Sequence, residues 1–177
     1  IPVFMPGTEI ASSVWSDIAT FLPEALYEYY GDKEVLKENY PMMKDWVDWI
    51  TKQDKARGQK YLYDFGNQLG DWLALDGRTE QRMEGTDEYF IGSCYYSMSV
   101  KKVAKAAEIL GLEEDAKKYN ELYQNIYAAI LREYFTESGR LAIDTQTGYL
   151  VSLYSGVYKE KELVVEGLKG RLFKDCY

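Results

Sequence analysis

Two short segments of this sequence place a tryptophan next to a carboxylate. Trp15 and Asp17 belong to the tripeptide Trp-Ser-Asp, and Asp71 and Trp72 are neighbours within YDFGNQLGDWLALDG, residues 63–77. An indole offers a large apolar face, and a carboxylate accepts hydrogen bonds from hydroxyl groups. Three of these residues also have a purely structural alternative. Trp15 can be a core aromatic, Asp17 can form a hydrogen bond between helices, and Asp71 can cap a turn.

The charge and the missing histidine exclude several classes of function. None of the 177 residues is histidine, which removes imidazole bases, histidine-ligated zinc and Ser-His-Asp triads. Acid–base chemistry must therefore use carboxylates, lysines or tyrosines. The formal net charge of -8 repels phosphate backbones and anionic membranes, so we expect neither a nucleic-acid nor a membrane partner. No pattern points to a metal or a cofactor.

The chain has the length of one domain, and we treat residues 1–177 as a single unit. No stretch approaches the roughly 20 apolar residues of a membrane-spanning helix. Cys94 lies among apolar helix positions and is most simply a small buried hydrophobe. The sequence begins without methionine at IPVFMPG, and we interpret the chain as part of something larger.

Apolar residues at three- and four-residue steps predict the helices that must position the candidate residues. The first is expected over Glu9–Tyr30, with Pro23 kinking or dividing it. The second follows the N-cap Asp32, has Pro41 as a site of bending, and loses its pattern after Gln53.

The pattern resumes after an irregular segment of about thirty residues, a length that is usually functional or partly disordered. We predict a helix capped by Thr86 and ending at Gly111, and directly after it a fourth with a stripe from Ala116 to Ile130. The last two are expected over Thr145–Val157 and Glu160–Lys174, although glycines at 148, 156, 167 and 170 weaken that expectation. A short hairpin is an option at KYLYDF or GRLAID. The sequence thus predicts an all-α fold of three helix pairs.

Several segments in this order resemble the catalytic domain of bacterial α-L-rhamnosidases, glycoside hydrolase family 78. They are IPVFMPG, SVWSDIATFLPEALYEYYGDKEVLKENYPMMKDWVDWI, LGDWL, AKAAEILGLEEDAKKYNELYQNI and DTQTGYLVSLYSGV. The ILGLEEDAKKYNELY pattern is shared by many helical-toroid glycosidases and supports only the fold. The resemblance implies helical hairpins that form about half of an (α/α)6 toroid.

The resemblance also implies a sugar site whose acid and base lie outside this chain. The family inverts at the anomeric carbon with two carboxyl groups, and the segments that supply them in the family have no counterpart here. Residues 1–177 alone should therefore not hydrolyse glycosides. What remains is one wall of a rhamnose pocket, for which we predict Trp15, Asp17, Asp71, Trp72 and Gln146 as substrate-binding residues and no catalytic residue.

Two other readings stay open. One is a helical-repeat interaction module, which needs helix pairs of nearly constant length. The other is a related toroid enzyme for another sugar. Half of a toroid would expose apolar helix flanks, so we also expect self-association. The compartment stays open among the bacterial cytoplasm, the periplasm and secretion.

Overall fold

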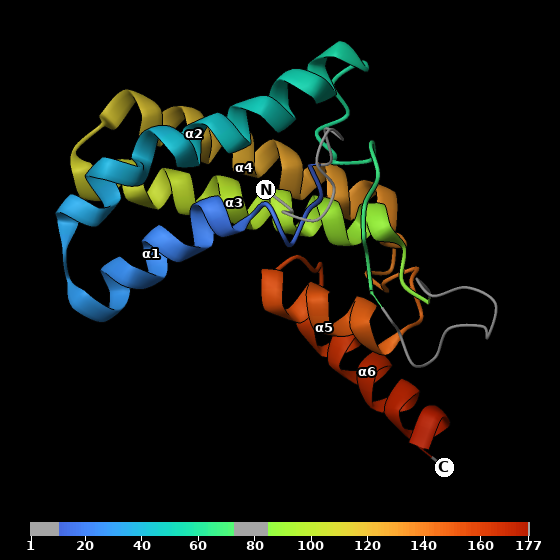
Figure 1. Cartoon of the computed structure of the whole chain (residues 1–177). Helices are drawn as coiled ribbons and strands as arrows, with labels where there is room; N and C mark the ends of the chain where they lie inside the picture. Colours follow the sequence, from blue (N-terminus) through green and yellow to red (C-terminus); the bar gives the residue numbers. More distant parts are fainter. Residues whose placement is uncertain (1–10, 73–84, 177) are drawn as a thin grey trace.

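A computed structural model describes residues 11–72 and 85–176 of the chain (Figure 1). This part contains six α-helices and no β-strand. The helices are α1 Ile18–Tyr30, α2 Lys33–Ala56, α3 Glu88–Leu110, α4 Glu113–Tyr134, α5 Gln146–Ser155 and α6 Lys161–Cys176. The predicted all-α class and the order of the six helices are confirmed. None of the described helices is long and apolar enough to cross a bilayer.

The helix ends follow local chemistry, with one correction. Gly31 and Gly111 end α1 and α3 in the left-handed conformation, at φ of 67° and 76°, which glycine adopts without steric cost. Asp32 caps α2 by accepting the Glu34 N–H. The cap of α3 is Asp87, whose carboxylate accepts the Phe90 N–H at 2.7 Å. The prediction that Thr86 caps this helix is therefore wrong.

The first helix is shorter than the sequence predicts and is not divided. It begins at Ile18, because the described residues before it form turns in which Val14 adopts a φ of 70°. A β-branched residue in that conformation cannot belong to a right-handed helix. Pro23 lies inside α1 and Pro41 inside α2, and both helices continue through them.

The helices pack in consecutive pairs around α3. The pairs α1–α2, α3–α4 and α5–α6 are each in contact, and α3 also contacts α1, α2 and α5. The described parts of α1 and α5 do not contact each other. Every residue from Phe90 to Val100 except Tyr95 is buried, as expected for a helix with neighbours on several sides. The helices α1, α3 and α5 therefore form one row, with their partners packed beside them (Figure 1).

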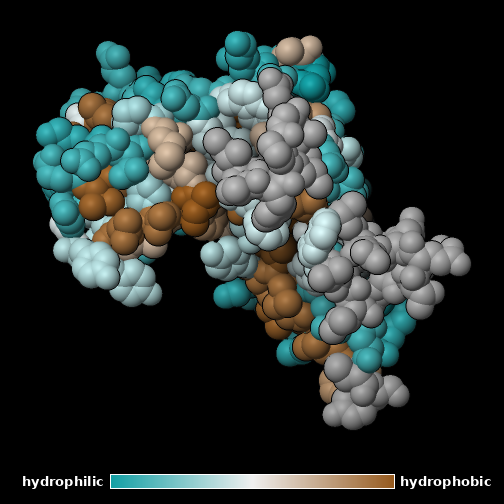
Figure 2. All heavy atoms as spheres, in the orientation of Figure 1, coloured by the Kyte–Doolittle hydropathy of each residue, from teal (hydrophilic) through white to brown (hydrophobic). Residues whose placement is uncertain are grey.

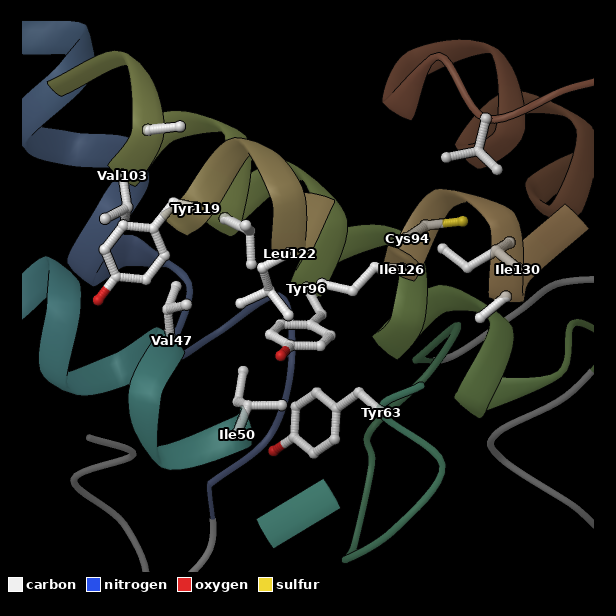
Figure 3. Close-up of a cluster of buried hydrophobic side chains, with 14 of the residues drawn as sticks. Val47, Ile50, Tyr63, Cys94, Tyr96, Val103, Tyr119, Leu122, Ile126 and Ile130 are labelled. Carbon is white, nitrogen blue, oxygen red and sulfur yellow. The ribbon is translucent and has the colours of Figure 1, made fainter. Parts of the chain in front are cut away.

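The main core lies between α2, α3 and α4 (Figure 3). Cys94 is fully buried in it, and burial raises the pKa of its thiol to about 12, as expected for a packing residue. Tyr119 is buried while its hydroxyl donates to Asp48 at 2.9 Å, so its polar end stays paired. The tyrosines at 123, 127 and 134 are partly buried against the same core.

The two hairpin options have different outcomes. Residues 60–65 at KYLYDF are irregular. At GRLAID, one isolated antiparallel bridge joins Phe135 and Leu141, without extending into strands.

Two of the glycines near the C-terminal end, Gly156 and Gly167, have specific structural causes. Gly156 ends α5 at a φ of 75°. A Cβ at Gly167 would lie 2.6 Å from Cζ of Tyr149, so α6 crosses α5 closely at this point. Nothing lies within 4 Å of a Cβ at Gly170. The predicted helices are present because packing between α5 and α6 outweighs the weak helix propensity of glycine.

Apolar side chains remain exposed along the row. Ile18 and Leu22 of α1 are 53% and 49% exposed, and Leu150 of α5 is 52% exposed. Figure 2 shows apolar surface over both helices.

Candidate functional site

The starts of α1, α3 and α5 are joined at one end of the row by buried polar contacts. The backbone N–H and Oγ of Ser13 both donate to Oε1 of Gln68, each at 2.8 Å. Ser12 Oγ accepts the N–H of Leu69 at 3.0 Å. The turn before α1 is thus attached to the irregular segment between α2 and α3. We call the surface formed by residues 11–16, 66–72, 85–88 and 144–146 the rim.

The rim continues across the start of α3. A Cβ at Gly92 would lie 3.1 Å from the carbonyl oxygen of Tyr63 and 3.4 Å from Ser13 Oγ, so glycine lets both segments approach this helix. Gly70 has a φ of 53°, and a Cβ there would lie 3.1 Å from that of Glu88. The turn that presents Asp71 and Trp72 therefore lies against the first residue of α3.

A hydroxyl pair connects α3 with α5. Thr86 Oγ1 and Thr145 Oγ1 lie 2.7 Å apart, and both residues are buried. Thr145 also caps α5 by accepting the Gly148 N–H at 3.0 Å. The helical pattern predicts a helix start at Thr145, but not the contact with Thr86.

Asp17 lies beneath the rim and not on it. Its residue is only 1% exposed. One carboxylate oxygen accepts from Trp46 Nε1 at 2.8 Å and from Ser99 Oγ at 2.6 Å, and the other accepts the Val14 N–H at 2.7 Å. Burial raises the pKa of Asp17, and these hydrogen bonds oppose the rise. The prediction that this carboxylate binds substrate directly conflicts with its burial, whereas the structural alternative agrees with these contacts.

The two tryptophans of the rim are accessible. Trp15 is 48% exposed and Trp72 is 51% exposed, and Asp71 is half-buried beside Trp72. Trp15 precedes α1 and does not belong to its apolar stripe, so the core alternative for this residue is wrong. An accessible indole on an anchored turn can pack against the apolar face of a ligand.

Gln146 is engaged with the neighbouring helix. Its Nε2 donates to Oδ2 of Asp175 on α6 at 2.8 Å, and Arg171 Nε donates to the same oxygen at 2.8 Å. Contact between Gln146 and a ligand at the rim would require this amide to leave Asp175.

The other buried acids are also engaged. Asp54 accepts the N–H groups of Lys60 and Tyr61, each at 2.9 Å, which holds the turn after α2. Glu24 pairs with Lys102 and Lys105 across α1 and α3. Within residues 11–72 and 85–176, no three His, Cys, Asp or Glu side chains are grouped to hold a metal ion.

An apolar groove between α1 and α2 is a feature that the sequence pattern did not indicate. Its volume is about 550 Å³. Its lining consists of Ala11, Ser16, Ile18, Ala19, Leu22, Pro23, Leu26, Asn39, Met42, Asp45 and Trp46. The periodic stripe of α1 predicts apolar residues here, and their exposure agrees with the uncovered helix flanks expected for half of a toroid, but the groove against α2 was not predicted.

The family is decided by comparison with known proteins. The family model for the bacterial alpha-L-rhamnosidase six-hairpin glycosidase domain matches residues 1–176. The chain belongs to this family. Three hairpins of the six-hairpin domain are therefore described here, in agreement with the toroid expected from the resemblance.

Similar proteins agree with the rhamnosidase family. An alpha-L-rhamnosidase of Alteromonas sp. strain LOR is 30% identical over 174 residues, which are 96% of this chain and 19% of that protein. The crystal structure of the Aspergillus terreus enzyme matches with a TM-score of 0.84 at 26% identity, over 99% of this chain and 20% of that one.

The Streptomyces avermitilis enzyme, solved with L-rhamnose, shares the fold at a TM-score of 0.78 and 24% identity. The match covers 93% of this chain and 15% of that one. The chain thus spans about a fifth or less of these relatives.

Proposed function

We propose that this chain is the central part of the helical catalytic domain of a longer α-L-rhamnosidase, and that it supplies one wall of the pocket for a terminal rhamnosyl group. The observation that carries this proposal is the family match over nearly the whole chain, to relatives about five times as long. The rim supports it locally, because two accessible indoles lie on turns that buried hydrogen bonds fix to the starts of the row helices.

Trp15 and Trp72 are the residues best placed to contact the sugar. The methyl group and ring C–H groups of rhamnose form an apolar patch, and an indole face covers such a patch. The carboxylate of Asp71 is half-buried next to Trp72 and can accept a hydrogen bond from a sugar hydroxyl. Gln146 is a further candidate contact, and binding the sugar requires its amide to give up the hydrogen bond to Asp175.

The acid and the base belong to other parts of the longer protein. In the inverting mechanism an acid protonates the leaving oxygen while a base activates water, and the two carboxyl groups stand roughly 6.5–9.5 Å apart. Asp17, Glu24 and Asp54 have structural partners in this chain, so none of these buried carboxylates is available for either role. The chain accordingly positions the rhamnosyl group and makes apolar contact with it.

The test compares the complete protein with the isolated chain on 4-nitrophenyl α-L-rhamnoside. We expect release of nitrophenol by the complete protein and none by residues 1–177. In ¹H NMR, β-L-rhamnose should be the first product, as inversion requires. A complete protein that is inactive on the rhamnoside but active on another nitrophenyl glycoside would assign it to a toroid enzyme for a different sugar.

A second function, a repeat-type interaction module, is disfavoured by the helix lengths. Tetratricopeptide-like arrays repeat one helix pair of nearly constant size. Here α1 and α2 have 13 and 24 residues, whereas α5 and α6 have 10 and 16.

A further inference from the structure

The turn before α1 holds a conformation that its sequence disfavours. Val14 has a φ of 70°, in the left-handed region that β-branched residues rarely adopt. Such a residue persists only where its surroundings fix it, and strained positions of this kind concentrate at functional sites. The neighbouring residue is Trp15, the exposed indole of the rim.

The group that fixes this conformation is the carboxylate of Asp17. Its Oδ2 accepts the Val14 N–H at 2.7 Å, across three residues of the turn. Its Oδ1 is held from the other side by Trp46 of α2 and Ser99 of α3. The carboxylate therefore connects the turn to two other helices, α2 and α3.

We propose that Asp17 is a positioning residue for sugar binding: its buried carboxylate fixes the left-handed turn at Val14 and thereby sets the place of the Trp15 indole on the rim. The link to sugar binding rests on the proposed function, because Trp15 is the residue that would contact the rhamnosyl group. Asp17 itself acts without touching the sugar.

The substitution Asp17→Asn tests the inference without a change of size. An asparagine in the same orientation keeps an acceptor for Trp46 and Ser99, but it places an amide donor against the Val14 N–H. The turn then loses the acceptor that compensates its strain. Adding Val14→Gly removes the strain itself, because glycine adopts positive φ without a steric cost.

The first readout is the position of Trp15 in the folded chain. Four tryptophans labelled as 5-fluorotryptophan give four ¹⁹F resonances, which Trp→Phe variants assign. We expect Asp17→Asn to shift or broaden the Trp15 resonance and Val14→Gly/Asp17→Asn to restore it.

The matched control is Asp54→Asn. Asp54 is likewise buried and holds a turn with a positive φ at Tyr61, but in another part of the fold. It should leave the Trp15 resonance in place. An unmoved Trp15 resonance in folded Asp17→Asn would overturn the proposal.

A second measurement covers the case in which Asp17→Asn does not fold. In the unaltered chain, the Val14 amide should exchange with solvent deuterium at least about tenfold more slowly than an unbonded turn amide, because it is hydrogen-bonded to a buried carboxylate. Exchange at the unprotected rate would overturn the proposal without any variant.

The functional readout is the KM of the complete protein for the rhamnoside. Losing an ordered aromatic contact should raise KM about tenfold in Asp17→Asn, with a smaller change in kcat. In a Trp15→Ala background, Asp17→Asn should have no further effect on KM, because it acts through Trp15. A full additional effect would overturn the positioning role. If Trp15→Ala alone leaves KM unchanged, the assignment of Trp15 to the sugar pocket fails, while the ¹⁹F result still decides whether Asp17 positions the indole.

Discussion

The close crossing of α5 and α6 predicts opposite effects for two glycine substitutions in the same helix. Gly167 and Gly170 both lie inside α6, where alanine is intrinsically favoured over glycine by about 1 kcal/mol. At Gly170 a Cβ has no heavy atom within 4 Å, so Gly170→Ala should stabilise the chain by about that amount.

At Gly167 the added Cβ would overlap the Tyr149 ring, at 2.6 Å from Cζ and 2.8 Å from the hydroxyl oxygen. Tyr149 is 8% exposed, and its hydroxyl bonds to Asp144 at 3.1 Å, which restricts its retreat. Overpacking of this kind costs about 1–3 kcal/mol. The two variants should therefore differ by at least about 1 kcal/mol, with Gly167→Ala the less stable.

The assay is urea unfolding of both variants, followed by circular dichroism and extrapolated to zero denaturant. The expected difference corresponds to a shift of a few degrees in Tm, roughly 2–4 °C per kcal/mol for a chain of this size. Gly170→Ala is the control for helix propensity, since both variants gain the same stability from replacing glycine by alanine in a helix. Equal stabilisation by both alanines would refute the close crossing and with it the packing account of the C-terminal helix pair.

Three further predictions address charge, ligand contact and association. Lys44 beside Asp115 holds the pKa of that carboxyl below its ordinary value. The ion pair therefore stabilises the fold above about pH 4, and this stabilisation is lost as the pH falls through the lowered pKa. Asp115→Asn should thus cost about 1 kcal/mol in urea unfolding at pH 7 and nearly nothing at pH 2.5, and a cost that is the same at both pH values would contradict the ion pair. Trp72→Ala in the complete protein should raise KM for the rhamnoside about tenfold, measured by nitrophenol release, and an unchanged KM would remove Trp72 from the pocket. The isolated chain should associate through the exposed apolar flanks of α1 and α5, and Leu22→Glu with Leu150→Glu should shift it toward monomer in sedimentation velocity; a monodisperse unaltered monomer would contradict that expectation.

The periodic part of the fold could be predicted from the sequence because burial there follows one helix face. The stripe Leu36, Met43, Val47 and Ile50 is fully buried on α2, and Tyr119 with Ile126 is buried on α4. A glycine that follows an apolar helical pattern, such as Gly111, also predicts the end of that helix. These features depend on residues close together in the chain.

What could not be predicted depends on contacts between distant residues. The start of α1 was placed too early because an apolar pattern does not record that Asp17 holds Val14 in a left-handed turn. The glycines of α6 weaken the expectation of a helix, and the structural reason for Gly167, the Tyr149 ring, lies 18 residues away in sequence. The burial of Asp17 could not be predicted for the same reason, since its donors at Trp46 and Ser99 come from two other helices.

The central place of α3 limits how a disturbance can travel through this chain. Within the described residues α1 and α5 share no contact, but both lie against α3. A change at the N-terminal hairpin can therefore reach the C-terminal one through α3 and the segments attached to its first turn, or through α4, which bonds to Asp48 of α2 and to the Tyr158 carbonyl after α5. Because almost every residue in the first half of α3 is enclosed, small displacements there are resisted by close packing. Substitutions in the two flanking hairpins therefore do not meet directly at α1 and α5, and the central pair α3 and α4 constrains both.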